Sequence, residues 1–350
     1  MSRRLSVNIR STVLALALLS TAACDAATPP YDPGTPEDRG VKLVSWPAGA
    51  AGEYFGRSDI VWTLSGSEIF FDDQLGLRAV TVSTSAIRSI ATNTFIEGVT
   101  RAMNGERIYY AHNLVTSAPY TDPNLRVARF HPAGGLEETV TLSNGIAEGM
   151  WVSPNEQFLA VNYALYNLQT GTRRDMGGRP HGFSPDGTKL LYQDPGGAGS
   201  QYQLMSTETN AQEAIHFQGN YTAHRWIANA PQMLTTEWSF PSPAAFVALV
   251  ETNGITRETR ELARFATSST FVSVAWSPDG QSLAAWVEQD RARWNLFLIR
   301  PGTEPRIIAS FRAPQGSSPG RIAFSPSGTA VAFSFLGIGS DSGLYVKTSF

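Results

Sequence analysis

The chain has 350 residues, 27 basic and 30 acidic side chains, and a formal net charge of -3 at pH 7. Proteins that bind nucleic acid need clustered basic surface to displace phosphate counterions, so this charge balance argues against a nucleic-acid partner. The length fits one or two domains, and a single cysteine excludes internal disulfide bonds.

Residues 1–23 have the layout of a secretory signal peptide. Basic residues up to Arg10 precede an apolar run over 13–19, and small residues follow that run as far as Cys24. The apolar run is too short to cross about 30 Å of hydrocarbon as a helix of the mature protein. The sequence therefore predicts an exported protein.

The segment 19–24, Leu-Ser-Thr-Ala-Ala-Cys, resembles the lipobox of bacterial lipoproteins, whose cysteine is acylated and becomes the first mature residue. Such motifs usually carry leucine three residues before the cysteine, and here that position holds Thr21. Either this variant is accepted and Cys24 is lipidated, for instance with palmitate, or the cleavage is that of an ordinary secretory signal. The resemblance implies a membrane-anchored lipoprotein on the periplasmic side of the bacterial cell envelope. It does not distinguish between the inner and the outer membrane.

The segment after the cysteine is predicted to be a tether. Residues 25–40 lack hydrophobic periodicity and are rich in proline, which favours an extended backbone. We therefore expect a signal peptide over 1–23, a lipid anchor and tether over 24–40, and one folded domain over 41–350.

Beyond residue 40, short runs rich in Val, Ile, Phe, Tyr and Trp alternate with turn residues, a pattern that predicts an all-β fold. Three segments share an aromatic residue, Ser-Pro, Asp or Ser, and Gly, followed by an apolar strand: 183–187, 276–280 and 324–328. Serine suits the first turn position, proline presets φ at the second, and glycine accepts the left-handed conformation that follows. Each copy predicts a hairpin turn.

Weaker copies of this unit bring the number to seven: 61–66, 103–105, 151–155 and 226–230. The spacing averages about 44 residues, which is the length of a four-stranded propeller blade. The sequence thus predicts a β-propeller of seven four-stranded blades, with six as the alternative. The strand 41–46 is expected to close the ring by joining the C-terminal blade, because closure removes free sheet edges.

The aromatic-Ser-Pro-Asp-Gly turns resemble the repeats of TolB-type, WD-like propellers, with strong copies over 149–350 and weak copies over 59–148. The resemblance implies a cell-envelope protein that docks another protein at the mouth of its central channel. Similar repeats also form the propeller half of some prolyl peptidases, but no hydrolase half accompanies them here.

The sequence gives little sign of catalysis. The segment 316–320 matches the Gly-x-Ser-x-Gly pattern of a nucleophile elbow, but a strand pattern follows it instead of a helix, and Pro319 lacks the N–H of an oxyanion hole. The histidines show no metal-ligand spacing. We expect no catalytic residue, no metal site and no cofactor.

Aromatic residues that precede the turns are expected to fill the core between blades: Trp62, Trp151, Phe183, Trp226, Trp276 and Phe324. Polar residues just before them are expected near one channel mouth, as candidate binding residues: Asp59, His181, His224, Arg225 and Arg321. The leading hypothesis is a monomeric, non-catalytic module, anchored to the lipid bilayer, that docks an envelope protein. The alternative is a small-molecule-binding or hydrolytic propeller that uses the channel mouth. A broad mouth with exposed apolar residues favours docking, whereas a pocket of convergent titratable groups favours the alternative.

Overall fold

The computed structural model describes most of the chain after residue 37. The described residues are 38–46, 60–73, 76–92, 94–114, 124–143, 149–194, 201–215, 217, 221–227, 230–239, 246–266, 271–289, 293–312, 317–336 and 341–350. The signal peptide, Cys24 and the tether lie outside them. Within these ranges no helix is long and apolar enough to span a membrane.

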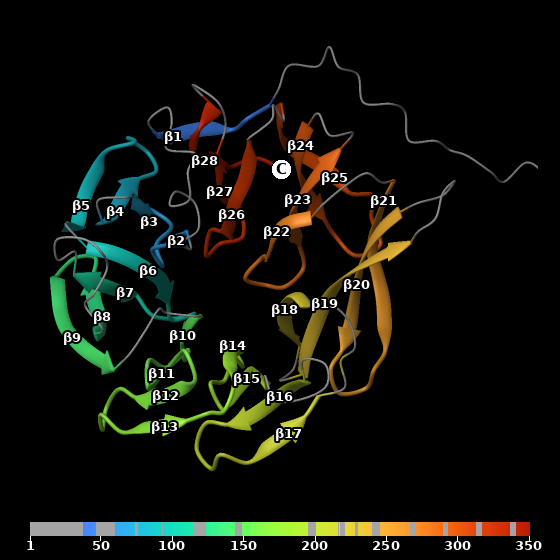
Figure 1. Cartoon of the computed structure of the whole chain (residues 1–350). Helices are drawn as coiled ribbons and strands as arrows, with labels where there is room; N and C mark the ends of the chain where they lie inside the picture. The colour runs from blue at the N-terminus through green and yellow to red at the C-terminus, as the bar shows by residue number, and fades with distance from the viewer. Residues whose placement is uncertain are drawn as a thin grey trace, which may run out of the picture. The chain divides into compact units, whose positions relative to one another are not determined.

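Residues 37–350 form one compact unit, in which seven antiparallel sheets of four strands each are arranged in a ring (Figure 1). This arrangement confirms the predicted seven-bladed β-propeller. The innermost strand of each blade, in chain order, is β2 (Val61–Trp62), β6 (Thr94–Arg101), β10 (Met150–Val152), β14 (Arg179–Phe183), β18 (Tyr221–Ile227), β22 (Phe271–Trp276) and β26 (Ser318–Phe324).

The remaining strands follow outward in each blade. The second strands are β3 (Glu68–Asp73), β7 (Ile108–Leu114), β11 (Phe158–Val161), β15 (Lys189–Asp194), β19 (Ala230–Ser239), β23 (Leu283–Gln289) and β27 (Val331–Leu336). The third strands are β4 (Gly76–Thr81), β8 (Asn124–His131), β12 (Ala164–Asn167), β16 (Gln201–Ser206), β20 (Phe246–Asn253), β24 (Arg293–Ile299) and β28 (Gly343–Lys347). The outer strands are β5 (Ile87–Thr92), β9 (Gly135–Ser143), β13 (Arg173–Asp175), β17 (Gln212–Ala214), β21 (Thr259–Ala266), β25 (Arg306–Arg312) and, for blade 7, β1 (Val41–Ser45).

Strand β1 closes the ring as the sequence predicts. It pairs antiparallel with β28, with Val41 opposite Val346 and Val44 opposite Leu344. Leu43 and Val44 are buried in a core cluster that blade 7 shares with blade 1. Strand β1 is therefore the outer strand of blade 7, whose other three strands, β26, β27 and β28, come from the C-terminal part of the chain.

The repeated serine explains why each strong turn forms. The Ser277 hydroxyl donates a hydrogen bond to the Asp279 carboxylate at 2.5 Å and accepts one from the Ser282 backbone N–H at 2.9 Å. Ser184 makes the same two bonds, to Asp186 at 2.6 Å and from the backbone of Lys189 at 2.9 Å. The serine thus replaces backbone partners that the turn would otherwise leave unpaired.

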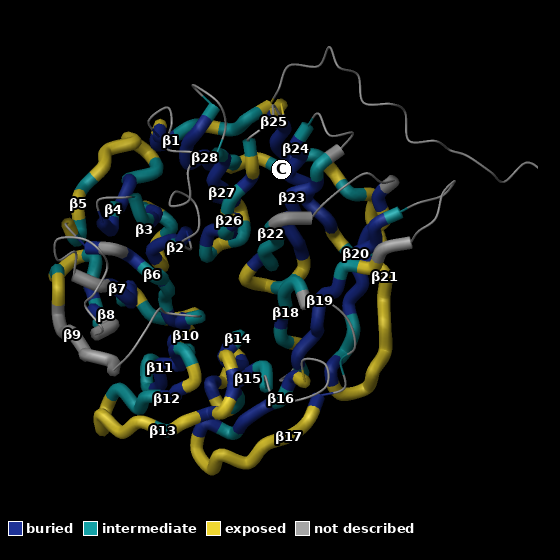
Figure 2. The backbone as a smooth tube through the Cα atoms, viewed as in Figure 1, coloured by how far each residue is buried: buried dark blue, intermediate teal, exposed yellow. Residues whose placement is uncertain are grey.

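The core lies between adjacent blades. Figure 2 shows the middle strands largely buried and outer strands such as β13 and β17 largely exposed. Trp62, Phe183 and Phe324 are buried as expected for residues between blades, with 4 %, 7 % and 8 % exposure. Each belongs to a core cluster with residues of the preceding blade.

Candidate functional site

The inner strands of blades 3, 4 and 5 bring one aromatic and two histidine side chains together in the wall of the channel. The Trp151 side chain is 39 % exposed, unlike the other aromatic residues of the repeat, and its ring centroid lies 6.3 Å from that of His224. A β-carbon at Gly182 of β14 would lie only 2.9 Å from Nε2 of His224. Glycine at this position therefore allows the His224 ring to lie against the neighbouring blade.

His181 lies close enough to His224 for the two imidazoles to interact electrostatically. A β-bulge between Pro180 and Gly182 interrupts the alternation of β14. The His181 ring lies 5.4 Å from the ring of Tyr202, and its Nε2 is 3.4 Å from Oε1 of Gln193. The structure thus brings together two of the five predicted channel residues, His181 and His224.

Both histidines are neutral at pH 7. Burial lowers the pKa of His181 to about 4, although the Gln193 hydrogen bond opposes this change. Burial, together with the charge of His181, lowers the pKa of His224 to about 3. Neutral imidazoles both donate and accept hydrogen bonds, so this wall offers hydrogen-bonding groups beside an exposed indole.

These two pKa values predict an acid-sensitive fold. An unfolded histidine titrates near pH 6.5, so between pH 6.5 and 4 the unfolded chain takes up protons that the folded chain excludes. The free energy of unfolding should therefore decrease as the pH is lowered through this window, by at most about 1.4 kcal/mol per pH unit for each histidine. Urea unfolding of the H181Q/H224Q variant should show a flatter profile than the parent. An unchanged slope would show that the two imidazoles are protonated in the folded protein.

Arg225 does not join this group. Arg225 turns away from the channel wall and makes a bidentate ion pair with Glu251 at 2.6 and 2.9 Å, and both side chains are at least 90 % buried. The same guanidinium contacts the Gly280 carbonyl and lies 4.4 Å over the Trp276 ring. Arg225 therefore joins blade 5 to blade 6.

Arg321 lies on β26 of blade 7, where its side chain is exposed and its backbone N–H donates to the Ser334 hydroxyl at 2.9 Å. Asp59 and Cys24 lie outside the described residues. Among the residues that the structure describes, no group of three or more His, Cys, Asp and Glu side chains is placed to hold a metal ion.

The turns between inner and second strands form a second feature, which we call the rim. Three exposed apolar side chains lie in it or next to it: Leu64 in blade 1, Met103 in blade 2 and Ile227 at the end of β18 in blade 5, with 37 %, 48 % and 46 % exposure. The repeat prolines occupy the corresponding turns of the other blades: Pro154, Pro185, Pro278 and Pro326.

Neighbouring turns of the rim are in contact. A β-carbon at Gly66 would lie 3.9 Å from Cδ of Pro326, and one at Gly328 would lie 3.9 Å from Cδ of Pro278. The turns of blades 6, 7 and 1 therefore pack against one another on one face of the ring.

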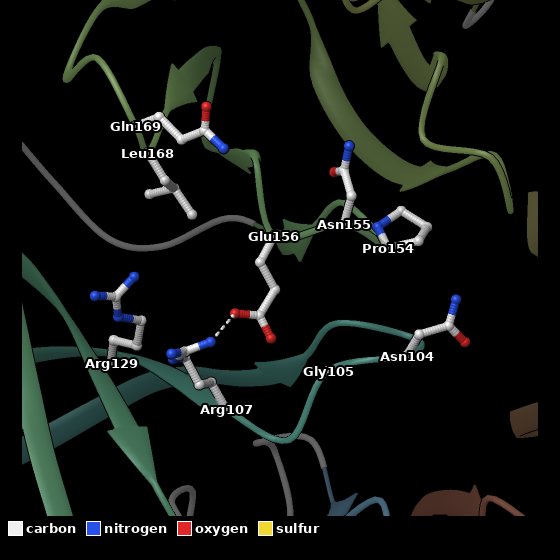
Figure 3. Close-up of a pocket in the computed structure, with 9 residues that line it drawn as sticks. All are labelled: Asn104, Gly105, Arg107, Arg129, Pro154, Asn155, Glu156, Leu168 and Gln169. Atoms are coloured by element: carbon white, nitrogen blue, oxygen red, sulfur yellow. Dashed lines mark hydrogen bonds and ion pairs between the residues drawn. The ribbon is translucent and has the colours of Figure 1, made fainter.

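A pocket of about 420 Å³ lies between blades 2 and 3 (Figure 3). It is lined mainly by polar side chains, and the Arg107 guanidinium donates to the Glu156 carboxylate at 2.9 Å across it. The sequence did not predict this site. The only local signal is that Glu156 occupies the place that glycine holds in the strong repeat turns.

Comparison with known proteins supports the fold alone. No family model and no curated protein matches the sequence. Among solved structures, oligogalacturonate lyase in complex with manganese is 14 % identical, with a TM-score of 0.59, covering 89 % of this chain and 98 % of its own. Kuenenia stuttgartiensis hydrazine synthase is 15 % identical, with a TM-score of 0.56 and coverage of 91 % and 99 %. TolB from Acinetobacter baumannii is 12 % identical, with a TM-score of 0.42 and coverage of 73 % and 66 %.

Proposed function

We propose that this protein is an exported lipoprotein, anchored through Cys24, whose monomeric and non-catalytic propeller docks a protein of the bacterial cell envelope. The observation that carries the proposal is the rim, where Leu64, Met103 and Ile227 expose apolar surface on one face of the ring. A protein partner would cover this surface and remove it from water, at roughly 25 cal/mol per Å² of apolar area. The lipobox resemblance at Cys24 supports the proposed membrane location.

A second candidate function uses the channel wall. Trp151, His181 and His224 place an exposed indole beside two imidazoles whose pKa values are strongly lowered. Perturbed titratable groups gather at ligand and catalytic sites as well as at structural ones. This wall therefore favours a small-molecule ligand with an apolar face and hydrogen-bonding edges. The fold does not decide between the two candidates, because propellers carry many functions.

The rim can be tested by crosslinking in native cells. We expect the parent protein to capture one abundant envelope protein, and the M103D variant to lose at least about 90 % of that product, because the new charge must be desolvated on docking. Tyr163 provides a matched control. It is 46 % exposed and lies in the turn between β11 and β12, on the opposite face of the ring. Y163D should keep the product, and equal loss from both variants would contradict docking at the rim.

The anchor is tested separately by cell fractionation. The parent protein should sediment with membranes, whereas the C24A variant should be released into the soluble exported fraction, because the acyl chains supply most of the membrane affinity. Retention of C24A with the membranes would rule out the lipid anchor. Because this measurement does not depend on the partner, it separates location from docking.

A further inference from the structure

The pocket between blades 2 and 3 differs from the channel and from the apolar part of the rim in its chemistry. Its lining combines two arginines, one glutamate and three side-chain amides with a few apolar atoms. Figure 3 shows Glu156 and Arg107 joined across it, with Arg129 from blade 2 and Gln169 from blade 3 beside them. Its volume of about 420 Å³ suits a small organic molecule.

The charged side chains that line this pocket are two arginines and one glutamate. Glu156 accepts hydrogen bonds from Arg107 at 2.9 Å and from the Tyr109 hydroxyl at 3.1 Å. Arg129 lines the pocket from β8. Two guanidinium groups and one carboxylate therefore line the pocket, a balance that favours an anion.

The turn that supplies Glu156 departs from the repeat in a way that serves the pocket. In the turns of blades 4 and 6 the fourth position holds Gly187 and Gly280, both with positive φ. Glu156 has a φ of 55° at the same position. A left-handed conformation is strained for a residue other than glycine, and strain of this kind is often retained where the side chain has a task. Here the glutamate holds Arg107 in place.

We propose that this pocket binds a small organic anion that carries carboxylate or phosphate groups. Guanidinium groups recognise both oxyanions through paired N–H donors, and the amides of Asn104, Asn155 and Gln169 supply further donors at the opening. Glu156 positions Arg107 and also limits the affinity through its own negative charge. The inference does not depend on the lipid anchor or on docking at the rim.

Isothermal titration of the purified full chain with citrate, and separately with glycerol 2-phosphate, tests the proposal. R129Q should weaken binding at least about tenfold, because it removes one of the guanidinium groups of the lining. E156Q should strengthen binding several-fold, because it removes the opposing charge while its amide can still accept from Arg107. These opposite effects cannot both arise from partial unfolding. Saturation by only one of the two anions identifies the oxyanion class.

R173Q is the matched control for loss of charge. Arg173 lies on β13 of blade 3, which forms one side of the pocket. It pairs with Asp175 at 2.7 Å and does not line the pocket. This variant should bind with the parent's affinity. The proposal is overturned if neither anion binds at about 10 mM, or if R129Q and R173Q weaken binding equally, since only general electrostatic attraction would then remain.

Discussion

Replacing Arg225 with alanine is expected to lower the free energy of unfolding by about 3 kcal/mol. Among the described residues, the change would leave the buried Glu251 with the half-exposed Arg260 as its one ionic partner, at 2.6 Å. It would also remove the contacts of Arg225 with Trp276 and with the turn of blade 6. Urea unfolding followed by circular dichroism would measure the loss.

Two further variants separate a buried ion pair from simple loss of charge. R260A removes the other, half-exposed partner of Glu251 and should cost less than about 1 kcal/mol. R225M/E251L removes both buried charges and should recover much of the stability lost in R225A. If R225A and R260A cost the same, Arg225 does not join blades 5 and 6 as the contacts indicate.

Deleting residues 38–46 should abolish cooperative folding of the propeller. The deletion removes β1, exposes the edge of β28 and takes Leu43, Val44 and Trp46 out of the core between blades 7 and 1. A free hydrophobic edge promotes pairing between molecules, so we expect aggregation as well as loss of stability. Thermal unfolding and size-exclusion chromatography would measure both effects.

Deleting residues 26–34, an equal length of the predicted tether, is the control for the β1 deletion. This second deletion should leave the melting temperature unchanged, because the proline-rich sequence has no hydrophobic periodicity to pack. A cooperative melt of the 38–46 deletion at the parent's temperature would show that blade 7 is stable with three strands.

Architecture was predictable where it depends on local sequence. Ser277, Asp279 and Gly280 specify one turn through contacts within six residues, and the spacing of three such turns and four weaker copies predicted the number of blades. The closing strand followed from the incomplete final blade. Short-range turn chemistry therefore carried most of the information about the fold.

The candidate sites depend on contacts that the repeat does not encode. Arg225 pairs with Glu251 26 positions away, and the pocket joins side chains of two blades. Trp151 was predicted to fill the core between blades, yet it lies two residues before Ser153, whereas Trp276 lies one before Ser277. Along a strand, an offset of one residue turns a side chain to the other face. That offset accounts for the exposure of Trp151.

The pairing of β1 with β28 also determines when this chain can finish folding. Lys42 and Ser342, 300 positions apart, share a hydrogen bond of 3.0 Å, so the first strand has its partner only after almost the whole chain has emerged. A chain that crosses a membrane from its N-terminus would expose Leu43 and Val44 throughout the passage. Closure of the ring therefore requires both ends of the propeller, and until they pair, the free edge of β28 and the apolar residues of β1 favour aggregation.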